Sequence, residues 1–168
     1  SESTGAKILK DKAPSTITGV SIASDNSTIA VTMSEAVYNT NGGNGALEAS
    51  DFTFTISGGA ASLSSATPTS ISSSGNVYTL GIGISGTPTG AETLTVNPVD
   101  NGIYDALGNE SITNQSNNSA NLKDKAPPTI TGVSLASDNS AIYLTMSEAV
   151  YNSNSGSGSL EASDFSFS

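Results

Sequence analysis

Short runs in which apolar and polar residues alternate recur along the chain, and segments rich in Gly, Ser, Asn and Pro separate them. A two-residue alternation predicts antiparallel strands with one buried face. Strands are expected at residues 16–22, 28–33, 52–56, 77–84, 92–96 and 120–123, with one or two weaker strands between residues 61 and 72. No segment has a convincing 3.6-residue period, and residues 46–50 could form one helical turn at most.

The inward positions of these strands supply enough apolar volume for an ordinary core, with Ile29, Val31, Phe52, Phe54 and Leu94 among them. About seven strands in about 110 residues is the strand density of an immunoglobulin-like sandwich. The expected fold class is therefore all-β, built from immunoglobulin-like antiparallel β-sandwiches.

The alternating pattern occurs twice, at an offset of 113 residues. The segment that begins at Asp11 aligns without a gap with the segment that begins at Asp124, and 34 of 45 aligned positions are identical. Self-similarity at a fixed period indicates a tandem-repeat architecture. Residues 1–10 are expected to be the last strand of a preceding repeat, residues 11–123 one complete repeat, and residues 124–168 the first part of the next.

The segment of residues 124–168 is too short to close a core by itself, because domains of about 40 residues usually need disulfides, metals or a partner. The favoured interpretation is that it belongs to a longer polypeptide that completes it. The alternative is that strands of another chain complete it.

Composition narrows the possible functions. The chain contains no Cys, His or Trp, and it has 5 basic residues against 15 acidic ones. The basic residues are all lysines at or beside the junctions between repeats: Lys7, Lys10, Lys12, Lys123 and Lys125. The acidic body of the repeat would repel nucleic acid and anionic lipid, and no apolar run is long enough to span a membrane. No enzymatic activity is expected, because acid–base and nucleophilic catalysis rely mainly on side chains that the repeat lacks.

Three segments together resemble the bacterial immunoglobulin-like repeats of giant surface proteins: TITGVSIASDNSTIAVTMSEAV (residues 16–37), DFTFTISGG (residues 51–59) and IYDALGN (residues 103–109). Such repeats occur in very large adhesins and gliding-type surface proteins of Gram-negative bacteria. The resemblance implies a secreted, extracellular segment on the bacterial cell surface, with a role in cell adhesion or gliding motility. It also implies tandem arrays that calcium often rigidifies.

Several oxygen-bearing side chains are expected near one pole of the sandwich, where the loops 34–50 and 99–118 meet. Calcium takes six to eight oxygen ligands of this kind. The candidate calcium ligands are Asp11, Glu35, Asp51, Asp100, Asp105 and Asn109, with Asp124, Glu148 and Asp164 as the repeated counterparts of Asp11, Glu35 and Asp51. Two alternatives remain open. The side chains could cap loop amides or form Asx-turns around Gly108, or Lys12 could neutralise Glu35 across the junction.

The same two loops carry candidate ligand-binding residues, namely Tyr38, Asn44 and Tyr104. The tyrosines could stack on a sugar, or they could cover the end of the core. The leading interpretation is a structural repeat of a large adhesin or stalk, which contacts neighbouring repeats of the same chain and spaces a distal binding region. The alternative is a module that binds a surface glycan or protein through the two loops.

Overall fold

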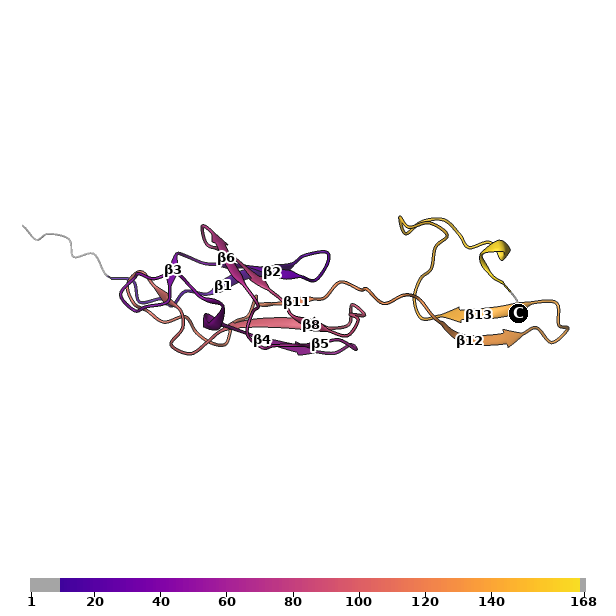
Figure 1. Ribbon diagram of the computed structural model, residues 1–168, viewed down its shortest axis with the longest axis horizontal. Helices are drawn as coiled ribbons and strands as arrows, with labels where there is room; N and C mark the ends of the chain where they lie inside the picture. Colours follow the sequence, from indigo (N-terminus) through magenta and orange to yellow (C-terminus); the bar gives the residue numbers. More distant parts are fainter. Residues whose placement is uncertain (1–9, 167–168) are drawn as a thin grey trace, which may run out of the picture. The chain divides into compact units, whose positions relative to one another are not determined.

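The computed structural model describes residues 10–166, and these residues form an all-β chain (Figure 1). The contacts divide it into two compact units, of which the first ends at Lys125 and the second begins at Ala126. The strand expected within residues 1–10 falls outside the described residues, except for Lys10. Each unit is described by itself below.

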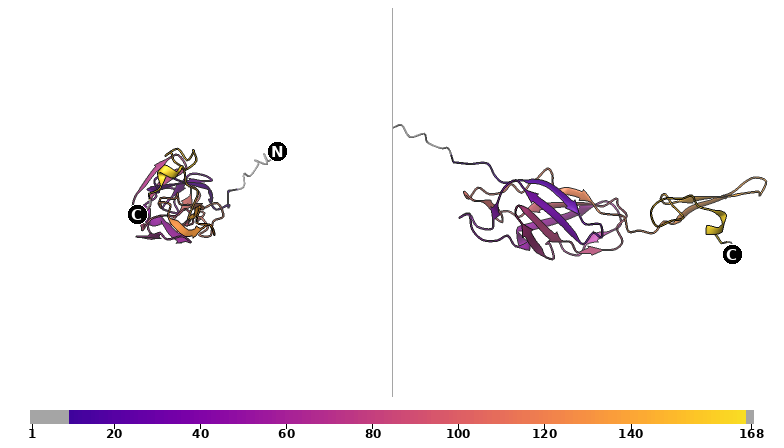
Figure 2. Two further views of the ribbon diagram at one scale, coloured as in Figure 1. Left: turned by 90° about the vertical axis from the view of Figure 1, so that its right-hand side faces the viewer. Right: turned by 90° about the horizontal axis from the view of Figure 1, so that it is seen from above.

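Two antiparallel sheets contain most strands of the first unit (Figures 1 and 2). One sheet has the order β1-β2-β7-β6, with β1 at Ile17–Ile22, β2 at Thr28–Met33, β7 at Val77–Gly81 and β6 at Ile71–Ser74. The other has the order β11-β9-β4, with β11 at Ser119–Asn121, β9 at Thr93–Pro98 and β4 at Phe52–Ser57. Two short ribbons pair β3 (Val37–Tyr38) with β10 (Tyr104–Asp105) and β5 (Ser62–Leu63) with β8 (Ile84–Ser85). A single 3-10 turn, η1 (Ala49–Asp51), precedes β4.

Both sheets direct alternate side chains into one core, as the two-residue pattern predicts. Ile29 and Val31 of β2 and Leu94 of β9 are completely buried. Phe52 of β4 lies with its ring centroid 6.2 Å from that of Tyr78 on β7, so the two sheets also meet through aromatic rings. The all-β prediction is confirmed.

Some predicted boundaries differ from those of the structure. The run expected at residues 77–84 divides into β7 and β8, because the chain changes its partner along this run. The amide of Ile82 still donates to the carbonyl of Ser27, next to β2, whereas the carbonyl of Gly83 accepts the amide of Ser64, next to β5. The strands β3 and β10 lie on segments expected to be loops, since two residues are too few to produce an alternating pattern.

The second unit repeats the first hairpin without the strands that cover it in the first unit. Its strands β12 (Ile130–Leu135) and β13 (Ile142–Met146) pair in the same register as β1 and β2, and a 3-10 turn, η2 (Ala162–Asp164), follows. Ile29 is 0% exposed whereas its counterpart Ile142 is 43% exposed, and Ile17 is 2% exposed whereas Ile130 is 53% exposed. Residues 126–166 include no counterparts of β7, β9 or β11, which explains the exposed apolar face.

Candidate functional site at the two poles of the first unit

The linkers meet the first unit at its opposite ends. At the end that we term the N-terminal pole, the amide of Thr16 donates to Ser34 Oγ just after β2 (3.0 Å). At the other end, the C-terminal pole, the turn between β1 and β2 contacts Lys123. The six residues of β1 separate the two poles by roughly 20 Å, and Figure 1 shows the chain entering and leaving this unit at its two ends.

At the N-terminal pole, side chains of the segment 99–118 attach the linker to the sandwich. The buried hydroxyls of Ser15 and Ser111 hydrogen-bond to each other. The amide of Ile17 donates to Gln115 Oε1 (2.8 Å), and Asn109 Nδ2 donates to the carbonyl of Asp11 (3.2 Å). Residues 11–17 are therefore attached to the unit that follows them.

Asp105 organises this pole from within. It is 1% exposed, and its Oδ1 accepts the amides of Leu107 and Asn109, both at 2.8 Å. Its Oδ2 accepts Asn109 Nδ2 at 2.6 Å. Burial alone would raise the pKa of Asp105, but the hydrogen bonds from Asn109 and Leu107 outweigh it and lower that pKa. The charged carboxylate thus shapes a turn around Gly108, where φ is +80° and a Cβ would collide with the carbonyl oxygen of Asn41.

The candidate calcium ligands are brought together only in part. Asn109 Nδ2 donates both to the carbonyl of Asp11 and to the carboxylate of Asp105, so these three predicted residues lie close together. Burial raises the pKa of Glu35, and the charges of Asp105 and Asp11 raise it further. In contrast, Asp51 is occupied locally: its Oδ2 accepts the amide of Glu48 at 2.7 Å. Burial raises the pKa of Asp51, and the nearby charge that adds to this is that of Glu48.

The remaining candidates are also engaged locally or exposed. Asp100 accepts Asn101 Nδ2 at 2.9 Å. Asp124 is exposed in the first unit, while Glu148 and Asp164 are exposed in the second, where Asp164 accepts the amide of Glu161. Among residues 10–166, no three carboxylates gather closely enough to hold a metal ion. The calcium site stays a prediction, and the hydrogen bonds of Asp105 favour its turn-forming alternative.

The candidate ligand-binding tyrosines lie side by side. Tyr38 of β3 pairs with Tyr104 of β10, which confirms that the two long loops share one pole. Both side chains are half-buried, and the hydroxyl of Tyr104 donates to Asn101 Oδ1 at 3.4 Å. Asn44 is exposed, but its Oδ1 accepts Thr40 Oγ1 and its Nδ2 donates to Gly42 within the same loop. Tyr38 and Tyr104 are therefore paired neighbours that are each partly accessible to solvent.

At the C-terminal pole, one asparagine binds the backbone of the departing linker. Asn26 is 4% exposed and has a φ of +62°. Its Nδ2 donates to the carbonyl of Lys123 (2.8 Å), and its Oδ1 accepts the amide of Lys123 (2.7 Å). Two nearby amides of the same segment also have partners, because Leu122 donates to the carbonyl of Glu92 and Lys125 donates to that of Pro88.

Glu92 lies beneath this linker and is completely buried. Its carboxylate accepts the amides of Ala60 (2.7 Å), Ala61 (3.0 Å) and Thr89 (2.9 Å). Burial alone would raise the pKa of Glu92, but these backbone hydrogen bonds outweigh it and lower the pKa to about 2. A charged Glu92 therefore joins two loops next to the point where the linker leaves.

Sequence reasoning missed both Asn26 and Glu92. For Asn26 a signal exists, since the tripeptide of residues 25–27 recurs unchanged at residues 138–140 in a tight turn between two strands, where Asn tolerates positive φ. For Glu92 no comparable signal exists, because its partners are backbone amides distant in sequence.

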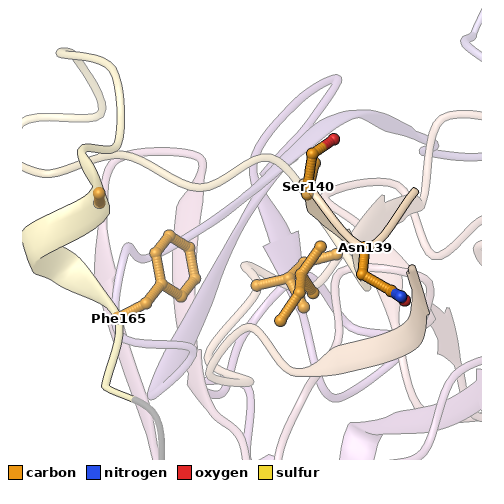
Figure 3. Close-up of a pocket in the computed structure, with 7 residues that line it drawn as sticks. Asn139, Ser140 and Phe165 are labelled. Carbon is orange, nitrogen blue, oxygen red and sulfur yellow. The ribbon is translucent and has the colours of Figure 1, made fainter. Parts of the chain in front are cut away.

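In the second unit, the turn that corresponds to the Asn26 turn borders an open apolar cavity of about 460 Å³. Figure 3 shows Phe165 on one side of this cavity and Asn139 and Ser140 on the other. Ile142 and Leu144 of β13 also line it. The counterpart of Phe165 in the first unit is Phe52, which is only 1% exposed. The cavity of the second unit therefore lies at the position that the hydrophobic core fills in the first unit.

Comparison with known proteins gives no match to a family model, to a curated protein or to a solved structure. Within residues 10–166, no helical segment has the length and apolar character needed to cross a bilayer.

Proposed function

We propose that the chain is a structural segment of a large extracellular surface protein, an adhesin or stalk, in which immunoglobulin-like repeats hold a distal binding region away from the cell. The strand orders β1-β2-β7-β6 and β11-β9-β4 support the immunoglobulin-like assignment, because constant-type domains divide their strands in this way. The near-identity of the two hairpins supports the tandem array. The location at a bacterial cell surface rests on the resemblance of the sequence.

The observation that carries this proposal is the attachment of the linkers at opposite poles of the first unit. Ser111, Gln115 and Asn109 hold the incoming linker, and Asn26 with Pro88 holds the outgoing one. Force applied to the two ends of the unit would therefore pass through the whole sandwich. Such an arrangement suits a spacer, whose repeats contact only their neighbours.

The proposal can be tested by displaying the chain on a bacterial surface between an anchor and a reporter binding domain, with one, two or four copies of residues 11–123. We expect the reach of the reporter to increase with each copy. Reach should not change when Tyr38, Asn44 and Tyr104 are all replaced by Ala. A reach that is independent of copy number would contradict the proposal.

The paired tyrosines favour a second candidate function, binding of a glycan or protein at the N-terminal pole. Tyr38 and Tyr104 offer adjacent, half-exposed rings of the kind that stack on sugars. If this function holds, the triple Ala variant should lose attachment to glycan-coated surfaces at unchanged copy number. Attachment that depends only on copy number would contradict this second function and support the spacer role.

A further inference from the structure

The contact between Asn26 and Lys123 joins a side chain to a backbone across 97 positions of sequence. A carboxamide has one donor group and one acceptor, as a peptide unit has. Here both are used on a single residue, since the amide and the carbonyl of Lys123 each bond to Asn26. Strand β11 ends at Asn121. Beyond this end, the side chain of Asn26 takes the place of a paired strand, because it bonds both backbone groups of Lys123.

The residue type at this position is tightly constrained. A φ of +62° is accessible to Asn and Gly and costly for most other residues. Gly would keep the turn but lacks the carboxamide, and Asp would accept the Lys123 amide but could not donate to the Lys123 carbonyl. Because Asn26 is 4% exposed, its polar atoms need these bonds to compensate for their burial.

The second unit contains the same turn without its burial. Asn139 has a φ of +59°, and the amide and hydroxyl of Ser140 donate to Asp138 as those of Ser27 donate to Asp25. Asn139 is nevertheless exposed, at the edge of the cavity in Figure 3. The turn conformation therefore does not depend on burial of the asparagine, which indicates a preorganised binding group.

On this basis we propose that Asn26 is a clamp for the outgoing linker: its carboxamide binds the backbone of Lys123 and fixes the direction in which the chain leaves the first unit. The clamp recognises backbone, so the exposed Lys123 side chain is free to vary, while Leu122, which is 2% exposed, anchors the segment in the core. The part of the linker between Lys125 and the next hairpin contains Pro127 and Pro128, whose φ angles are restricted. This inference deepens the proposed spacer function and rests on it.

Amide hydrogen exchange in the full chain, measured by NMR, tests the clamp. In Asn26→Gly, which keeps the turn, we expect the Lys123 amide to exchange about tenfold faster, in line with loss of a typical net hydrogen bond. The Leu80 amide in the central sheet should stay protected and serves as the internal control. The matched control is Asn139→Gly, the same change in the same turn of the second unit, which should leave Lys123 unaffected.

Unchanged exchange at Lys123 in Asn26→Gly would overturn the clamp. If Leu80 also loses protection in that variant, the substitution has destabilised the whole unit, and a measurement on the unsubstituted chain then tests the clamp. A scalar coupling through the hydrogen bond between the Lys123 amide nitrogen and the carboxamide carbon of Asn26 is expected, and its absence would overturn the proposal. Failure of the clamp is distinguishable from failure of the spacer function, because the latter is read from reach and copy number.

Discussion

Replacement of Glu92 by Gln tests how the C-terminal pole is held together. The change keeps the shape of the side chain but removes the charge, and it places an amide group against the backbone N–H groups of Ala60, Ala61 or Thr89. The pKa of Glu92 is lowered from 4.5 to about 2, and each pKa unit corresponds to about 1.4 kcal/mol, which sets a ceiling of about 3 kcal/mol. We expect a loss of about 2 kcal/mol in the free energy of unfolding at pH 7, since the amide retains part of the hydrogen bonding.

The loss should depend on pH with a defined sign. A carboxyl whose folded-state pKa lies below its unfolded value stabilises the fold fully above the unfolded value. This stability disappears as the pH falls from about 4.5 towards about 2. The difference between wild type and Glu92→Gln should therefore be constant above about pH 5 and shrink steadily below it.

Urea unfolding followed by circular dichroism, at intervals between pH 7 and pH 2.5, measures this difference. Glu148→Gln makes the same change of net charge at an exposed position and should alter stability by less than about 0.5 kcal/mol. A Glu92→Gln variant that unfolds like this control, or whose deficit is equally large at pH 3 and pH 7, would refute the account of Glu92.

Two further predictions concern the core and the calcium site. Ile29→Ala should cost about 2–5 kcal/mol, whereas Ile142→Ala, its counterpart with 43% exposure, should cost less than about 1 kcal/mol; equal losses in urea would contradict the difference in burial. Removal of calcium by a chelator should shift the Tm of the first unit by no more than about a degree, because the oxygens of Asp105 already accept hydrogen bonds. A calcium concentration of a hundred times its Kd would add about 2.7 kcal/mol if a site were present, and a stabilisation of that size would support the calcium interpretation.

Strands could be predicted from the sequence where large apolar residues stand at every second position and are deeply buried. In β2, the large apolar residues Ile29, Val31 and Met33 occupy every second position, and the observed bounds agree with the predicted ones. In β3 and β10 only two residues pair, so the sequence carries no periodic signal. The burial of a hairpin is also not a property of its own sequence, since nearly identical hairpins are covered in the first unit and exposed in the second.

The candidate site was predictable in its position and less so in its chemistry. The clustering of Asp105 and Asn109 near Asp11 follows from the order of the loops in a sandwich, and hydrogen bonds of Asn109 to both aspartates show it in the structure. The hydrogen bonds that occupy Asp105 depend on the local path of the turn, which spacing alone does not reveal. Asn26 was missed because its partner Lys123 lies 97 residues away in the linker after β11, and only folding brings the two together.

Small-angle X-ray scattering of arrays with increasing copies of residues 11–123 tests the central claim most directly, because it measures length without reference to any ligand. A spacer whose linkers are fastened at opposite poles should lengthen by the same increment with each added copy. Repeats joined by flexible linkers would instead lengthen roughly as the square root of the number of copies. Equal increments are the predicted result, and square-root growth would contradict the account.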